Sequence, residues 1–150
     1  MKWNEQKGNL FDLDDSYALA HCVSLDCSCP MSWGKGIAVE FYKRFKGMKK
    51  YCATVIRENN LKCPCVIPYC HNNRAVFNLI TKGKYFNKPT YMNFALAIED
   101  MAFMCEKFGI KKLGIYKLGC SLDGLSWGKV REIIQEKFKN LDIEIEVRYL

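Results

Sequence analysis

Two short glycine-containing segments stand where strands give way to helices, and both have the composition of an anion-binding loop. The first is Gly34-Lys35-Gly36, and the second runs from Gly119 to Gly124. Unpaired backbone N–H groups and the dipole at a helix N-terminus attract negative charge. Neither segment has the Gly-Lys-Ser/Thr ending of a P-loop or the six-residue dinucleotide fingerprint. Together they predict a bound diphosphate, although either alone is also typical of an ordinary α/β turn.

Nine cysteines and two histidines offer a second kind of chemistry. Cys27-Ser28-Cys29 and Cys63-Pro64-Cys65 could supply four thiolates to zinc, but the cysteines of a zinc pair are usually two or more residues apart. An odd number of cysteines in an intracellular chain argues against a disulfide framework. We therefore expect free cysteines, no metal, and core positions for His21 and Cys22 on an apolar strand.

Apolar periodicity predicts the elements that must hold these residues. Helical spacing of apolar side chains is found in four segments, and short apolar or alternating runs in five others. The helices are expected at 37–45, 48–59, 91–108 and 127–138. The strands are expected at 17–23, 63–70, 74–81, 113–118 and 142–149, the last with Ile143, Ile145, Val147 and Tyr149 on a buried face and Asp142, Glu144, Glu146 and Arg148 on a wet one.

Several element boundaries have local signals. Thr90 is the expected N-cap of the third helix and Gly109 its stop. His71-Asn72-Asn73 predicts a hairpin turn, and Pro64 and Pro68 make the strand before it irregular or an edge. Because strands and helices otherwise alternate, without repeats or linkers, we expect residues 1–150 to form a single α/β domain with a mixed sheet covered by helices.

Charge and hydropathy narrow the class of protein. Lys and Arg total 23 against 16 Asp and Glu, and the net charge of +7 favours an anionic partner or simply serves solubility. The chain has no run of about 18 apolar residues and no apolar stretch behind its N-terminal lysine, which argues against a membrane span or a secretory signal. We expect a monomeric cytoplasmic protein without a membrane partner, with a nuclear location also open.

Short segments in a fixed order resemble the macro domains, and among them the branch of the terminal ADP-ribose protein glycohydrolase. The similarity runs from about Lys7 to Leu150. The segments that show this similarity are Lys7-Gly8-Asn9-Leu10-Phe11, Ala20-His21-Cys22-Val23-Ser24, Gly34-Lys35-Gly36-Ile37-Ala38, Leu79-Ile80-Thr81-Lys82, Lys88-Pro89-Thr90-Tyr91 and Gly119-Cys120-Ser121-Leu122-Asp123.

This resemblance implies a three-layer α/β/α domain with a mixed central sheet. ADP-ribose would bind in a cleft at the strand ends, with its diphosphate between the two glycine loops and no cofactor required. The residues that the resemblance places against ADP-ribose are Asn9, Leu10, Phe11, Ser24, Gly34, Lys35, Gly36, Ile37, Thr81, Gly119, Cys120, Ser121 and Leu122.

By the same resemblance, Lys82 and Asp123 fall on the family's catalytic lysine and aspartate. The lysine attacks the anomeric carbon of the distal ribose to form a covalent lysyl intermediate, and the aspartate assists release. A deprotonated amine is a good nucleophile for such a carbon, and the charges of Lys84 and Lys88 would favour that form. Taken alone, Lys82 reads as a solvated lysine and Asp123 as a cap or turn residue.

The chain departs from the family pattern at three places. Asn9 replaces an aspartate that accepts a hydrogen bond from adenine in the family. We therefore expect adenine to bind less tightly but in the same pose. Ser121 replaces a glycine of the second loop, which affects the close approach of a phosphate. The stretch from Cys27 to Trp33 is longer than the loop of relatives, and Trp33 could shield the ligand or anchor its loop.

We expect an ADP-ribosyl hydrolase that removes mono-ADP-ribose from acidic protein side chains, with Lys82 as nucleophile and Asp123 as acid/base. ADP-ribosylated DNA and O-acetyl-ADP-ribose are further substrates to consider. The protein partner is favoured because basic residues are scattered and the sequence shows no aromatic-basic platform for bases. The alternatives are a non-catalytic ADP-ribose reader and, less favoured, a domain that binds RNA or single strands.

Overall fold

A computed structural model describes all residues from Met1 to Leu150 and contains one six-stranded sheet in the order β1-β6-β5-β2-β4-β3. The strands are β1 (Lys2–Lys7), β2 (Ala18–Ser24), β3 (Cys65–His71), β4 (Arg74–Lys82), β5 (Lys112–Ile115) and β6 (Glu144–Tyr149). The helices are the short 3-10 helix η1 (Leu10–Asp12), α1 (Ile37–Arg44), α2 (Met48–Asn59), α3 (Tyr91–Phe108) and α4 (Trp127–Phe138). No helix has the length and apolar composition that crossing a membrane requires.

The sheet is mixed, as predicted. β3 pairs antiparallel with β4, and every other neighbouring pair of strands is parallel. The hairpin turns through Asn72 and Asn73, whose φ angles of 50° and 68° are the positive values that a two-residue hairpin turn needs. Because β2, β4 and β5 are parallel, their carboxyl ends meet at one edge of the sheet, where α/β proteins bind ligands.

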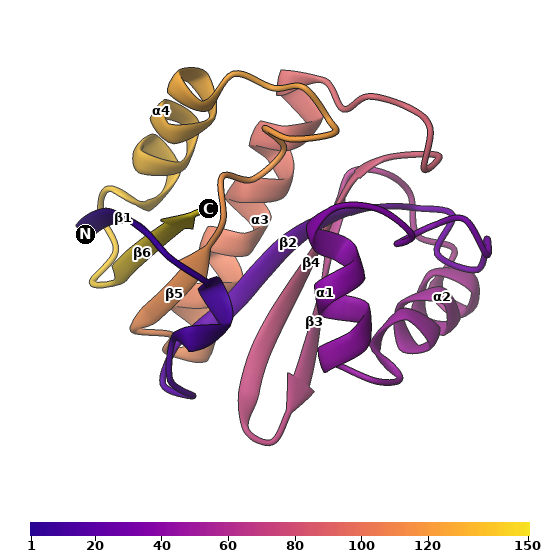
Figure 1. Cartoon of the computed structure of the whole chain (residues 1–150), viewed down its shortest axis with the longest axis horizontal. Coiled ribbons are helices and arrows are strands. Elements are labelled where there is room, and N and C mark those ends of the chain that lie inside the picture. The colour runs from indigo at the N-terminus through magenta and orange to yellow at the C-terminus, as the bar shows by residue number, and fades with distance from the viewer.

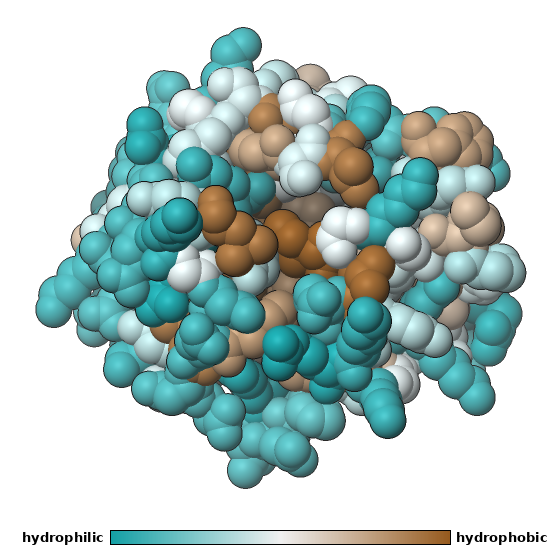
Figure 2. Space-filling model, in the orientation of Figure 1, coloured by the Kyte–Doolittle hydropathy of each residue, from teal (hydrophilic) through white to brown (hydrophobic).

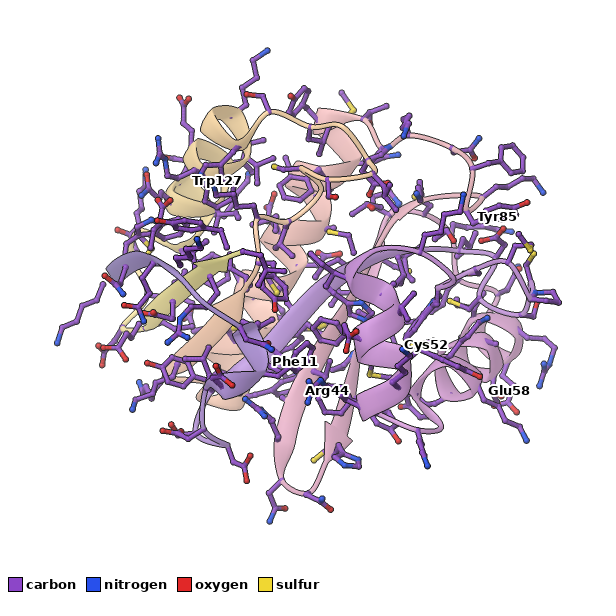
Figure 3. The ribbon with its side chains drawn as sticks, viewed as in Figure 1. Phe11, Arg44, Cys52, Glu58, Tyr85 and Trp127 are labelled. Carbon is purple, nitrogen blue, oxygen red and sulfur yellow. The ribbon has the colours of Figure 1, made fainter.

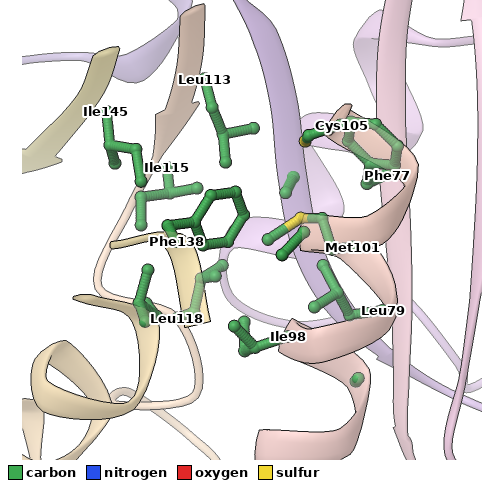
Figure 4. Packing of buried hydrophobic residues seen from close by; sticks show 14 of the residues in the cluster. Phe77, Leu79, Ile98, Met101, Cys105, Leu113, Ile115, Leu118, Phe138 and Ile145 are labelled. Atoms are coloured by element: carbon green, nitrogen blue, oxygen red, sulfur yellow. The ribbon is translucent and has the colours of Figure 1, made fainter. Parts of the chain in front are cut away.

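Helices cover the sheet on both faces, which makes the predicted three-layer α/β/α domain (Figure 1). On one face, α3 and α4 pack against the strands through fully buried side chains (Figure 4). Among these are Phe77 and Leu79 of β4, Ile98 and Met101 of α3, and Phe138 of α4. A second buried cluster, with Phe41 and Met48 among its members, joins α1 and α2 to the other face.

The predicted boundaries of α3 are confirmed. The Thr90 hydroxyl accepts a hydrogen bond from the Asn93 N–H at 3.0 Å, which caps the first turn. Gly109 follows the last turn with φ 69°, and its N–H bonds to the carbonyls of Cys105 and Glu106.

The predicted faces of the last strand are wrong at two positions, because Glu146 is buried and Tyr149, predicted on the buried face, is 37% exposed. β1, which the sequence did not predict, pairs with β6 and makes it an interior strand. Glu146 is therefore only 6% exposed. Its carboxylate accepts hydrogen bonds from the Asn4 amide at 2.9 and 3.0 Å and from the Arg148 guanidinium at 3.0 Å. The strand β5 is also shorter than predicted, because it ends at Ile115.

We expect Phe138→Ala to lower the free energy of unfolding by about 3–5 kcal/mol, because it empties a fully buried site between α4 and the sheet. Urea denaturation measures the change. Phe103, on α3, is 67% exposed, and Phe103→Ala should stay within about 0.5 kcal/mol of the wild type. Equal losses in the two variants would contradict this packing.

Candidate active site

A cleft of about 510 Å³ opens at the carboxyl edge of the sheet. The end of β2, from Ala20 to Ser24, lines it together with the first glycine loop before α1. The segment from Tyr116 to Asp123 and the connection between β4 and α3 complete its walls. The volume is within the range of pockets that hold small molecules.

The two glycine loops meet across this cleft. Gly36 has φ 66° immediately before α1, and a side chain there would start 3.1 Å from the Leu122 side chain of the second loop. Gly119 has φ 70°, and a Cβ there would lie 2.9 Å from the side chain of Leu125. Glycine is favoured at both positions, because a side chain at these positive φ angles would be strained and would also displace a neighbouring leucine.

Lys82 and Asp123 form an ion pair in the cleft. Lys82 is the last residue of β4 and Asp123 follows β5, yet their Nζ and Oδ1 atoms are 2.6 Å apart. Each side chain is only 13% exposed, so bulk water screens their attraction weakly. The Lys88 ammonium donates a hydrogen bond to the Leu122 carbonyl, which links the β4–α3 connection to the second glycine loop.

Two cysteines lie near the ion pair. Burial, together with the negative charge of Asp123, raises the pKa of the Cys22 thiol well above its usual range. Burial also raises the pKa of Cys120 to about 11. Both thiols are therefore neutral at physiological pH.

His21 is buried at 3% exposure, as a core residue should be, and it also lines the cleft. Its Nε2 lies 2.6 Å from the Asn78 side-chain oxygen. Its ring stacks on Phe41 at 4.0 Å and meets Trp33 edge-on at 4.9 Å. Burial lowers the pKa of His21 to about 4, so the ring is neutral at physiological pH.

Two charged residues that the sequence analysis missed hold the cleft walls. Asp26 accepts hydrogen bonds from the Ser24 hydroxyl and, at 3.0 Å, from the Tyr85 N–H. Lys49 of α2 donates to the carbonyls of Cys29 and Ser32 at 3.1 and 2.7 Å. Neither residue belongs to a motif, because Tyr85 lies 59 residues from Asp26 and the Cys29 and Ser32 carbonyls lie 20 and 17 residues from Lys49.

The long loop from Cys27 to Trp33 forms one wall. Trp33 has φ 65°, a strained value for a bulky residue, and is only 6% exposed. Its indole packs in the core beneath the loop and also borders the cleft, so it does anchor the loop.

Most predicted contact residues line this cleft, and some do not. Those that line it are Ser24, Gly34, Lys35, Gly36, Ile37, Gly119, Ser121 and Leu122, beside Lys82 and Asp123. Those that lie outside its lining are Asn9, Leu10, Phe11, Thr81 and Cys120.

The residues at the turn after β1 are occupied by contacts within the fold. The Asn9 side-chain oxygen accepts hydrogen bonds from the Phe11 N–H at 2.9 Å and the Tyr116 hydroxyl at 3.1 Å. Phe11 lies under the guanidinium of Arg44 at 4.3 Å and borders a separate cavity of about 250 Å³ (Figure 3). Leu10 is fully buried. Tyr116, which lines the cleft, connects this turn to it, because its hydroxyl also accepts a hydrogen bond from the Leu10 N–H at 3.0 Å.

All nine cysteines are unpaired, including the two pairs considered for zinc. The structure contains no group of three or more His, Cys, Asp or Glu side chains placed to hold a metal ion.

The buried neutral His21 should make the protein less stable in acid. Its pKa falls from the ordinary 6.5 to about 4, so below pH 6.5 the unfolded chain binds a proton that the folded chain does not. The free energy of unfolding should therefore fall by about 3 kcal/mol between pH 6.5 and 4 from this residue. Urea titrations at several pH values in this range should show that the free energy of unfolding depends less steeply on pH in His21→Gln than in the wild type. His71→Gln, which replaces the other histidine, is the control. An unchanged slope in His21→Gln would refute the assignment.

This chain is similar to known proteins in sequence and in structure. No family model matches the sequence. ADP-ribose glycohydrolase OARD1 of Homo sapiens is 37% identical over 141 residues, which cover 94% of this chain and 87% of that protein. Among solved structures, the macrodomain of Thermus aquaticus DarG has a TM-score of 0.86 at 20% identity, covering 99% of this chain and 98% of the other.

Thermosipho africanus DarTG in complex with ADP-ribose aligns with a TM-score of 0.82 at 18% identity, over 98% of this chain and 41% of that one. At such identities the structural likeness establishes the fold, whereas the 37% identity to OARD1 establishes the branch. This chain therefore belongs to the macro domains, in the ADP-ribose glycohydrolase branch that includes OARD1.

Proposed function

We propose that this protein binds ADP-ribose in the cleft and hydrolyses the bond that joins mono-ADP-ribose to an acidic protein side chain. The observation that carries the proposal is the Lys82–Asp123 pair, 2.6 Å apart, between two glycine loops. Membership of the ADP-ribose glycohydrolase branch supports it. A structural neighbour solved with ADP-ribose supports the choice of ligand.

The diphosphate would lie between the glycine loops. Gly36 precedes α1, whose free N–H groups and dipole favour negative charge. Lys35 adds a positive side chain at the mouth of the cleft. Tyr116 leads from the cleft toward Asn9, the end at which we place adenine. To accept a hydrogen bond from adenine, Asn9 would have to exchange one of its two internal hydrogen bonds.

Lys82 and Asp123 together can supply nucleophile and acid/base. An ammonium cannot attack, so its proton must first move, and the carboxylate 2.6 Å away can accept it. The free amine then bonds to the anomeric carbon while the bond from that carbon to the carrier oxygen breaks, and Asp123 can return the proton to the departing group. Water next adds to the lysyl adduct, releasing ADP-ribose and restoring the amine.

Lys82→Ala should reduce turnover at least about 100-fold while leaving ADP-ribose affinity nearly unchanged, because it removes the nucleophile and leaves the glycine loops intact. Asp123→Ala should also lose turnover, because the Lys82 ammonium then has no neighbouring carboxylate to accept its proton. Lys62→Ala, at an exposed site after α2, is the matched control. Normal turnover in Lys82→Ala would refute Lys82 as the nucleophile, whereas binding of ADP-ribose without turnover by the wild type would support the non-catalytic reader.

Gly36→Val should abolish binding of ADP-ribose, since a side chain there meets Leu122 and blocks the loop backbone. Gly109→Val is a control for placing valine at a positive φ, 69° against 66°, at a position that caps α3 away from the cleft and differs in ψ, 30° against −149°. In a thermal-shift assay, ligand at about 100 times its Kd stabilises a protein by about 2.7 kcal/mol. Wild type and Gly109→Val should show this shift. A full shift in Gly36→Val would contradict the proposed placement of the diphosphate.

A further inference from the structure

We propose that the mouth of the cleft is a docking surface for the acidic peptide segment that carries the ADP-ribosylated side chain. This surface, the rim, consists of Met31, Leu122, Phe86, Lys35 and Lys88, which line the cleft, together with Lys84, an exposed residue two positions before Phe86 in the β4–α3 connection. The proposal rests on the function proposed above and adds the recognition of the carrier.

The three apolar side chains of the rim are largely exposed to solvent. Met31, Leu122 and Phe86 are 57%, 53% and 65% exposed, and all three line the cleft. They come from three separate segments: the Cys27–Trp33 loop, the β5–α4 connection and the β4–α3 connection. Figure 2 shows a mostly hydrophilic face on which some hydrophobic residues lie near a hollow. Apolar groups exposed around a cleft mark a binding surface.

The rim is also positively charged. Lys35, Lys84 and Lys88 have no carboxylate within ion-pairing distance, in contrast to Lys82, which Asp123 neutralises. Asp123 is the only acidic residue that lines the cleft. A carrier with carboxylates beside the modified residue would therefore meet complementary charge.

The rim residues stand on loops that are fixed from beneath. Asp26 holds the backbone at Tyr85, next to Phe86, and Lys49 holds the carbonyls of Cys29 and Ser32 on either side of Met31. A surface that is ordered before binding loses less conformational entropy when a partner docks.

The geometry favours a peptide over a nucleic-acid strand. The rings of Tyr85 and Phe86 meet edge-to-face at 90° and 5.3 Å, so they do not offer two parallel faces for successive bases. Met31 and Leu122 have no aromatic face at all. Proteins that bind single strands rely on such stacking faces. Apolar side chains around a basic mouth instead suit an extended acidic peptide.

The decisive experiment compares wild type and Phe86→Ala on two substrates: a glutamyl-ADP-ribosylated acidic peptide and the small ester O-acetyl-ADP-ribose. Truncating a docking residue should raise KM for the peptide about 10-fold with little change in kcat. The kcat/KM for O-acetyl-ADP-ribose and the Kd for free ADP-ribose should not change. Phe103→Ala, equally exposed but on α3, is the matched control. A peptide KM that is unchanged in Phe86→Ala would overturn the docking surface.

A second comparison tests the charge of the rim. Lys84→Gln should lower kcat/KM for the acidic peptide and leave a peptide with glycine and serine around the modified glutamate unaffected. Lys111→Gln is its control, because Lys111 is exposed and lies just before the amino end of β5, at the edge of the sheet opposite the cleft. A larger KM increase for ADP-ribosylated single-stranded DNA than for the peptide in Phe86→Ala would overturn the peptide as partner.

Binding measurements separate this proposal from the catalytic one. Wild type should bind the ADP-ribosylated peptide more tightly than free ADP-ribose, and Phe86→Ala should remove that difference. Such a result without turnover of either ester would refute the hydrolase and support the rim. Turnover of both esters with equal affinity for the peptide and free ADP-ribose would refute the rim and support the hydrolase.

Discussion

The parallel pairing of β2 with β4 and β5 is the constraint on which the cleft depends. It places the carboxyl ends of these strands at one edge and aligns Ser24 with Lys82 after a shift in register. Side chains alternate between the faces of a strand, so a slip of one residue would exchange the positions of Thr81 and Lys82. Thr81 is buried at 1% exposure, whereas Lys82 reaches the cleft. The register thus decides which side chain meets Asp123.

The charges of the Lys82–Asp123 pair add little to the stability of the fold. Both side chains are largely removed from water, and desolvation offsets much of the attraction between two such charges. The pair is therefore a weak source of stability, and in the proposed mechanism it would donate and accept a proton. It joins two segments 41 residues apart, so its geometry depends on the sheet rather than on local structure.

The loops around the cleft are more firmly built than their composition indicates. Asp26 and Lys49 satisfy backbone groups of loops that no strand or helix would otherwise pair. Trp33 tolerates a left-handed backbone because its indole is buried in the core beneath its loop. With these anchors, residues such as Met31 and Phe86 can stay exposed at the mouth on an ordered surface.

The helices and the strands other than β1, with several of their boundaries, follow from local sequence patterns. The apolar spacing of α3, its Thr90 cap and its Gly109 stop act within a few residues, and so do the turn at Asn72-Asn73 and the left-handed glycines of the two loops. Tertiary structure alone decided strand order, and with it the burial of Glu146 beside β1 and the positions of Asn9 and Phe11 outside the cleft. It also decided that Phe86 lines the cleft and that Asp26 and Lys49 form hydrogen bonds with the backbone of its walls. Local patterns report which face of an element is buried, whereas these contacts join residues far apart in the chain, and their pairing depends on how whole elements pack.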